Sequence, residues 1–282
     1  MNVVRTIAAL TLRESARRKV LRALAALTVV LLALSAWGFS RLAAENDFGT
    51  MTSGQARLVA SQLLNLVMFG MSLIAALGTA FLAGPTVSGE VESGVALSML
   101  ARPVRRSAVL LGKWLGLVAF GSGFVVLAGL AQCVVVYLTV DYWPSQPVVA
   151  LALLGAQTAT LLTLGLLLST VISPMASGVV AVGLFGATWI AGVVGGLGAA
   201  FGNDGVARVG TVSQILLPTD GLWRGAMYAL QDPTAFAAFG AEMAGFPFLS
   251  AGPLSWAYLV WAALWIAMVW GLAALSFGRR DL

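Results

Sequence analysis

Charged residues divide this chain into a few long uncharged stretches. Residues 23–40 form a stretch of 18, 58–89 one of 32, 114–140 one of 27, 142–203 one of 62 and 243–278 one of 36. A helix needs about 20 apolar residues to cross a bilayer core about 30 Å thick. The pattern therefore predicts six transmembrane helices near 23–40, 60–83, 114–138, 148–171, 176–200 and 254–277. The longest stretch holds two of them, separated by the turn signal Ser173-Pro174.

The composition agrees with a membrane protein. Hydrophobic residues make up 60% of the 282 residues and charged residues 10%, against about 45–50% and about 25% in soluble domains. These values exclude a soluble enzyme, a disordered tail and a coiled coil, and we expect an all-α integral membrane protein with a single transmembrane domain over 1–282. The first span also resembles a signal peptide, but its long basic leader and the five spans that follow favour a membrane helix.

The distribution of Lys and Arg predicts the orientation. Twelve basic residues lie in the leader, between the second and third spans, and at the C-terminus, whereas four (Arg41, Arg57, Arg208 and Arg224) fall in the alternate connections. The positive-inside rule then places both termini in the cytoplasm. The net charge of +5 does not indicate a nucleic-acid partner, because the Arg residues are scattered between apolar spans.

Two cytoplasmic segments outside the spans have patterns of their own. Residues 1–19 have apolar positions at helical spacing, which favours an interfacial helix over an unstructured basic flag. Residues 84–113 carry Glu90 and Glu92 before a mostly apolar run and Arg residues after it. A short helix between Ser93 and Ala101, ending before Pro103, fits this charge order; docking element and solvated loop remain alternatives.

The external connection 201–252 is also patterned. Apolar residues recur at helical spacing on both sides of Pro218. The pattern predicts two short helices that lie on or dip into the outer leaflet, with Thr219 or Asp220 capping the second.

Several kinds of chemistry lack their residues. The chain has no His and one cysteine, Cys133, which excludes an internal disulfide and a Cys/His metal site. The closest approach to a phosphate-binding loop, around Gly112-Lys113, lacks the first Gly and the final Ser or Thr. The six predicted spans contain no Asp, Glu, Lys or Arg, which disfavours an ion-coupled carrier and an intramembrane enzyme. No catalytic, cofactor-binding or metal-binding residue is predicted. Gly112/Gly116 and Gly192/Gly196 have the spacing of close helix contacts, within or between protomers.

Three consecutive motifs resemble the ABC-2 type permease family. They are Gly89-Glu90-Val91-Glu92-Ser93-Gly94, then Leu100-Ala101-Arg102-Pro103-Val104-Arg105-Arg106, then Leu110-Leu111-Gly112-Lys113-Trp114-Leu115-Gly116. Leu217-Pro218-Thr219-Asp220 with Trp223-Arg224 resembles a further step of that family. The chain is similar to the branch that contains the permease of nitrous oxide reductase maturation.

The resemblance implies a membrane subunit, not itself an enzyme, that works with a separate cytoplasmic ATPase. Two permeases, as a homodimer or a heterodimer of close homologues, would assemble with two ATPases in a bacterial cytoplasmic membrane. ATP and Mg²⁺ would bind only to the ATPase. Residues 1–19 become the elbow helix, 84–113 the coupling loop and 201–252 the connection that holds a re-entrant element.

The resemblance also assigns site residues. Those implied in ATPase coupling are Glu90, Glu92, Ser93, Gly94, Arg102, Pro103, Arg105 and Arg106. Those implied at the outer gate are Pro218, Asp220, Trp223 and Arg224. For the three Arg of the coupling loop, orientation by the positive-inside rule alone is the alternative.

Two functions fit this reading. The first is export of a substrate, which the apolar spans suggest is hydrophobic or amphiphilic. The second is a mechanical or scaffold complex that passes ATP-driven motion to a periplasmic or extracellular protein without transporting a small molecule.

Overall fold

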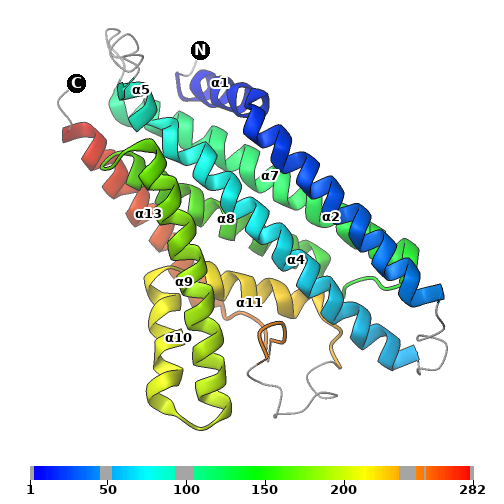
Figure 1. Ribbon diagram of the computed structural model, residues 1–282. Coiled ribbons are helices and arrows are strands. Elements are labelled where there is room, and N and C mark those ends of the chain that lie inside the picture. The colour runs from blue at the N-terminus through cyan, green and yellow to red at the C-terminus, as the bar shows by residue number, and fades with distance from the viewer. Residues whose placement is uncertain (1–2, 45–52, 93–104, 235–245, 251, 280–282) are drawn as a thin grey trace.

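The computed structural model describes residues 3–44, 53–92, 105–234, 246–250 and 252–279, and within these ranges all regular structure is helical (Figure 1). The helices are α1 (Val3–Arg17), α2 (Lys19–Ala44), α4 (Ser53–Ala83), the 3₁₀ turn η1 (Gly84–Thr86), α5 (Ser88–Glu92), α7 (Arg106–Val140), α8 (Pro147–Ser169), α9 (Pro174–Ala200), α10 (Asp204–Leu216), α11 (Thr219–Leu230) and α13 (Trp256–Arg279).

Six of these helices are long and apolar enough to cross a membrane. The candidate spans are Lys19–Arg41, Ala56–Thr86, Arg106–Val140, Pro147–Ser169, Pro174–Ala200 and Trp256–Arg279. The all-α fold with six spans that the sequence predicts is thereby confirmed, including the break before Pro174.

The third helix begins earlier than the sequence pattern predicts. It starts at Arg106, eight residues before the predicted Trp114. Charge-free stretches mark only the part of a helix that suits hydrocarbon, whereas the hydrogen-bonded helix continues through Arg106 and Lys113. Residues 106–113 of the predicted loop 84–113 are therefore helical, and Gly84–Glu92 forms η1 and α5.

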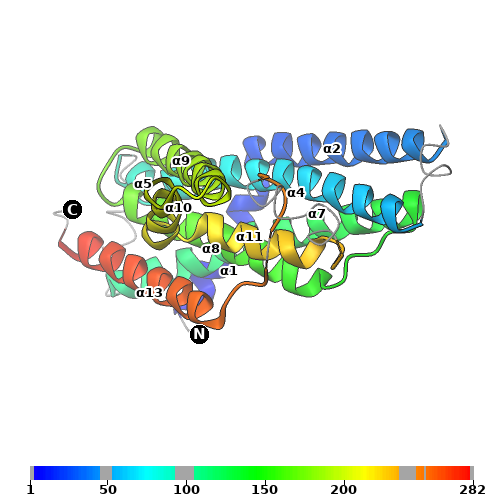
Figure 2. The same cartoon turned by 90° about the horizontal axis from the view of Figure 1, so that it is seen from below.

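The bundle has a central helix and two exposed ones. Helix α8 is the most buried span, at 72% of its most apolar window, whereas α2 is the least buried, at 11%. Figures 1 and 2 place α2 and α13 on opposite sides of the bundle. The starts of α1 and α5 and the end of α13 gather at one end, which we call the basic end, and the α9–α10 hairpin extends toward the other, the hairpin end (Figure 1).

Helix α1 packs directly on α7 because α7 presents two glycines there. An added Cβ on Gly112 would lie 2.7 Å from Ile7 Cβ, and one on Gly116 would lie 2.7 Å from the Ala8 carbonyl oxygen. The Gly112/Gly116 pair is thus a close helix contact within this chain.

On α9, Gly192 of the predicted Gly192/Gly196 pair is in close contact, and further close contacts follow at a spacing of three residues. Gly192, Gly195 and Gly198 are buried, as is Gly178 nearer the start of the helix. A Cβ on Gly195 would lie 2.6 Å from Gly210 Cα of α10. Gly195 and Gly198 thus contact α10, whereas Gly192 contacts Asp220 of α11.

The two short helices predicted within 201–252 are α10 and α11. The expected cap of the second is wrong: Pro218 is the N-cap residue of α11, with no side-chain cap hydrogen bond. Thr219 and Asp220 lie inside the first turn, where their side chains bond to other helices. The cap that does form is on α10, where Asn203 Oδ1 accepts from the Val206 N–H.

Candidate functional site

Half of the predicted coupling residues lie outside the described part of the chain. These are Ser93, Gly94, Arg102 and Pro103, together with the short helix predicted between Ser93 and Ala101. Glu90 and Glu92 fall in α5, and Glu92 is exposed. Arg105 is the exposed N-cap residue of α7, and Arg106 is its first residue.

Arg106 joins the start of α7 to the end of α13. Its Nη1 donates to the carbonyl oxygens of Phe277, at 3.4 Å, and Gly278, at 3.3 Å. The last carbonyls of a helix lack partners within the helix and carry its partial negative charge, so a guanidinium is favourable at this position. Besides contributing to the positive charge of this side, the Arg106 side chain therefore joins two membrane helices.

Lys113 is a buried residue that the site assignment from sequence omits. Only 5% of it is exposed, and its Nζ donates to the Thr86 carbonyl oxygen of η1 at 3.0 Å. A buried ammonium is costly unless it is hydrogen-bonded. Lys113 thus fixes η1, which precedes α5, against α7. The Gly-Lys step of the third motif was the signal for this residue.

The tip between α10 and α11 is joined to three spans by uncharged polar groups. The hydroxyls of Thr219 and Thr188 (α9) are hydrogen-bonded at 3.0 Å, and Gln157 Nε2 (α8) donates to the Thr219 carbonyl oxygen at 3.2 Å. Gln157 Oε1 in turn accepts from Ser72 Oγ (α4) at 2.8 Å. We call these four residues the tip network. It holds the start of α11 at one position along α4, α8 and α9.

Next to the tip network, Asp220 carries a carboxylate into the bundle. Its Oδ2 accepts from Arg224 Nε and from Gln214 Nε2, both at 2.8 Å. The Asp220 side chain is 1% exposed and the Arg224 side chain 22%. Gln214, Asp220 and Arg224 form what we call the Asp220 cluster. The six spans predicted from sequence contain no acid, but α11 brings the Asp220 carboxylate between them.

The other two predicted gate residues frame the Asp220 cluster. Pro218 precedes α11 and ends the turn from α10. Trp223 is 1% exposed and packs in the main hydrophobic core, where its ring centroid lies 5.5 Å from that of Phe69 of α4. The structure therefore places Pro218, Asp220, Trp223 and Arg224 together at the start of α11.

Three aromatic donors on α13 bind the last turn of α10. Tyr258 Oη, Trp261 Nε1 and Trp265 Nε1 donate to the carbonyl oxygens of Gln214 (3.0 Å), Ile215 (3.2 Å) and Leu216 (2.8 Å). We call these donors the aromatic ladder. A helix end inside a membrane protein has no water to satisfy its carbonyls, so side chains must supply the hydrogen bonds. Trp265 lies nine residues into α13, about 13 Å at 1.5 Å per residue, so the end of α10 lies well inside the bundle.

The end of α11 is bound in the same way. Tyr142, in the connection between α7 and α8, donates through Oη to the Leu230 carbonyl oxygen at 2.8 Å. Burial, reinforced by the negative charge of Asp232, raises the pKa of Tyr142 above its ordinary value. The phenol therefore remains a donor at any physiological pH.

Loss of one donor of the aromatic ladder leaves a carbonyl oxygen unsatisfied. We expect Trp265→Phe to lower the free energy of unfolding by about 1–3 kcal/mol, because the ring is largely replaced but the Leu216 carbonyl loses its partner. Thermal unfolding of the purified protein measures this. Trp256→Phe is the matched control, since Trp256 is 83% exposed; equal melting temperatures for the two variants would contradict the role of the hydrogen bond.

The chain is similar to known ABC-2 permeases. The family model described as ABC-2 family transporter protein matches residues 5–282. A protein of Pseudomonas aeruginosa, "Probable ABC transporter permease protein NosY", is 33% identical over 139 residues, which cover 46% of this chain and 47% of that protein. The match thus spans about half the length of this relative. Together with six candidate membrane spans, the family match over almost the whole chain shows that the protein belongs to the ABC-2 family of transporter proteins.

Proposed function

We propose that this chain is the membrane permease of an ATP-driven exporter in a bacterial cytoplasmic membrane. It works with a separate cytoplasmic ATPase that binds ATP and Mg²⁺, two copies of each subunit assembling together. The family match supports the transporter class. The apolar spans, with mean hydropathy between 1.8 and 2.2, favour a hydrophobic or amphiphilic substrate.

One observation carries the coupling part of this proposal. The described elements on either side of residues 93–104 are attached to the bundle: Lys113 of α7 holds η1, and Arg106 at the start of α7 holds the end of α13. An ATPase that displaces α5 or the start of α7 would therefore act on both α7 and α13. Glu92, which is exposed in α5 at the edge of the segment, is available to contact the partner.

The test measures assembly and ATP hydrolysis separately. The chain is co-purified with a candidate ATPase subunit and reconstituted in lipid. We expect Arg106→Ala to keep assembly but to lower permease-dependent ATP hydrolysis by about 2- to 30-fold, the range of coupling mutations. We expect Glu92→Ala to weaken assembly itself. Asp204→Ala, an exposed acid at the hairpin end, is the control and should change neither.

Two results would contradict the proposal. Full ATP hydrolysis by the Arg106→Ala complex would show that the α7–α13 contact transmits nothing. Normal assembly and hydrolysis with Glu92→Ala would remove α5 from the partner surface.

The mechanical alternative is separated by the same reconstituted complex. An exporter hydrolyses ATP faster when a transported amphiphile is added and accumulates that amphiphile in inside-out vesicles. A mechanical complex responds instead to an added periplasmic or extracellular protein, with no accumulation. The second result would show that the complex acts mechanically on that protein and does not export a substrate. The assignment of the coupling residues would still stand.

A further inference from the structure

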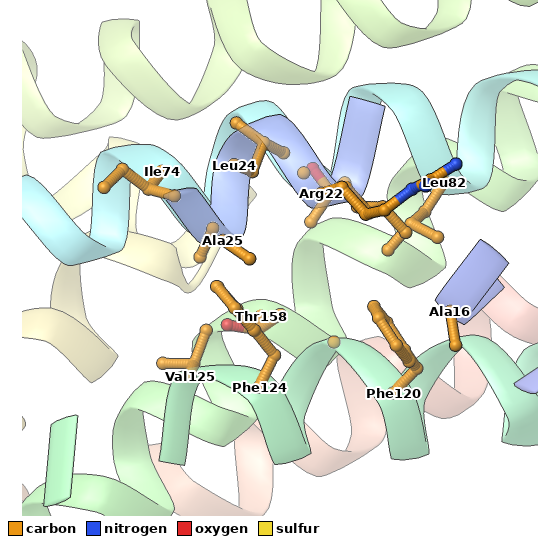
Figure 3. Close-up of a pocket in the computed structure, with 15 residues that line it drawn as sticks. Ala16, Arg22, Leu24, Ala25, Ile74, Leu82, Phe120, Phe124, Val125 and Thr158 are labelled. Carbon is orange, nitrogen blue, oxygen red and sulfur yellow. The ribbon is translucent and has the colours of Figure 1, made fainter. Parts of the chain in front are cut away.

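A cavity of about 160 Å³ lies between α2, α4 and α7, toward the basic end of the bundle. Figure 3 shows Ile74 and Val125 at one end of it, and Arg22 and Leu82 at the other. For comparison, an engineered cavity of about 150 Å³ is large enough to bind benzene. The cavity can therefore hold part of a hydrocarbon chain.

The walls of the cavity offer no free polar group in its interior. Thr79 and Thr158 line it, but their hydroxyls donate to the carbonyl oxygens of Ala76 and Leu154 in their own helices. Phe120 and Phe124 of α7 form much of the facing wall. Water is not held in such a space, and unfilled space of this size costs the packing contacts of its walls.

A single charge marks the mouth. The guanidinium of Arg22 lies beside Leu82 at the end of the cavity (Figure 3). Among the described residues, the structure gives the Arg22 side chain no hydrogen bond or ion pair. The neighbouring Arg18, by contrast, bonds Glu14 at 2.8 Å and the Phe81 carbonyl oxygen at 3.1 Å. Arg22 is thus available to an anion that comes from outside the chain.

The depth of the cavity matches one leaflet. From Leu82 to Ile74 is eight residues of α4, or about 12 Å, within the half-thickness of about 15 Å of a bilayer core. Helix α2, which forms one wall, is the least buried span. The molecule that reaches such a site has an anionic head at the membrane surface and an apolar chain below it.

We propose that this cavity is a binding site for an anionic phospholipid of the leaflet at the basic end. One acyl chain occupies the space between α2, α4 and α7, and the phosphate pairs with Arg22. The lipid then fills the gap between α2 and the rest of the bundle. This proposal does not depend on the transport function.

Native mass spectrometry of the purified full chain tests the site with two probes, phosphatidylglycerol and phosphatidylethanolamine with the same acyl chains. We expect Ala25→Leu, which fills the cavity from α2, to weaken phosphatidylglycerol binding about tenfold, since each buried methylene contributes about 0.8 kcal/mol. We expect Arg22→Gln to weaken it about fivefold and to abolish the preference over phosphatidylethanolamine.

Matched controls lie on α2 and α1. Ala26→Leu adds the same side chain to the exposed face of α2, and Arg5→Gln removes a charge from an exposed site on α1; both should bind as the wild type does. Gly78→Leu fills the cavity from α4 and repeats the test if Ala25→Leu does not fold. In lipid-free detergent, either filling variant should melt at a higher temperature than the wild type.

Binding at wild-type affinity in a folded cavity-filling variant would overturn the placement of the acyl chain. An undiminished preference for phosphatidylglycerol in Arg22→Gln would overturn the phosphate contact. Equal wild-type affinity for both lipids would overturn the selectivity for an anionic head.

Discussion

Arg224→Leu is expected to lower the free energy of unfolding by about 3–5 kcal/mol, because it leaves the Asp220 carboxylate buried without its cation. Asp220 is 1% exposed on its side chain, and its Oδ1 already accepts no hydrogen bond from the described residues. Gln214 would remain as the one donor to Oδ2. A neutral amide cannot offset the cost of a full charge in this environment.

A double-mutant cycle separates the ion pair from the bulk of the side chain. Asp220→Leu combined with Arg224→Leu should be more stable than Arg224→Leu alone, since no buried charge is left. Arg208→Leu, an exposed arginine on α10, is the control and should change stability by less than about 0.5 kcal/mol. Thermal unfolding in one detergent measures Asp220→Leu, Arg224→Leu, their combination and the Arg208→Leu control, and strictly additive effects in the cycle would show that the pair contributes nothing.

Gly192→Val is expected to be destabilising by about 3 kcal/mol or more. A Cβ at this position would occupy the place of the Asp220 carboxylate, with Oδ1, Oδ2 and Cγ all too close. The side chain must displace either α9 or Asp220. Displacing Asp220 breaks its bonds to Arg224 and Gln214, which adds the cost of a broken buried pair to that of overpacking.

The same substitution elsewhere on α9 should be harmless. An added Cβ on Gly186 would meet no atom within 4 Å, so Gly186→Val tests the effect of the side chain alone. Removing a glycine from a helix interior is favourable by up to about 1 kcal/mol. Melting temperatures that fall equally for the two variants would contradict the contact between Gly192 and Asp220.

The spans could be predicted from sequence because they depend on one local property. A stretch without charge and about 20 residues long crosses a bilayer whichever helices surround it. The ends could not be placed as well, since α7 continues through Arg106 and Lys113 beyond the apolar part. That extension depends on partners in α13 and η1, which are distant in sequence.

The consecutive helices α10 and α11 show what could not be predicted from the sequence. The two helices follow from apolar spacing around Pro218, but their depth depends on Thr188 and on the donors of the aromatic ladder. The sequence of residues 201–252 does not indicate that Thr188 and the aromatic ladder are its partners. Tyr258, Trp261 and Trp265 are spaced so that they share one face of a helix, and this spacing could have indicated a row of hydrogen-bond donors. Aromatic residues in membrane helices are usually interpreted as anchors at the membrane interface instead.

Charge was the other limit. The six predicted spans contain no Asp, Glu, Lys or Arg, and this holds for the apolar stretches that the sequence delimits. It did not describe the interior of the bundle, into which Asp220 enters from a connection and Lys113 from a helix end. Lys113 is stabilised by a hydrogen bond to Thr86 of η1, in a segment distant in sequence, whereas Asp220 is stabilised by Gln214 and Arg224 within its own connection.

Helix α13 is held at both of its ends. Arg106 binds the carbonyls of its final turn, and the aromatic ladder near its start binds the end of α10. Its 24 residues form a rod about 36 Å long that has no proline in it. A tilt of α13 imposed at Arg106 is therefore expected to displace its other end, and Leu216 of α10 with it. We expect a change at either end of the bundle to be transmitted to the other through this helix.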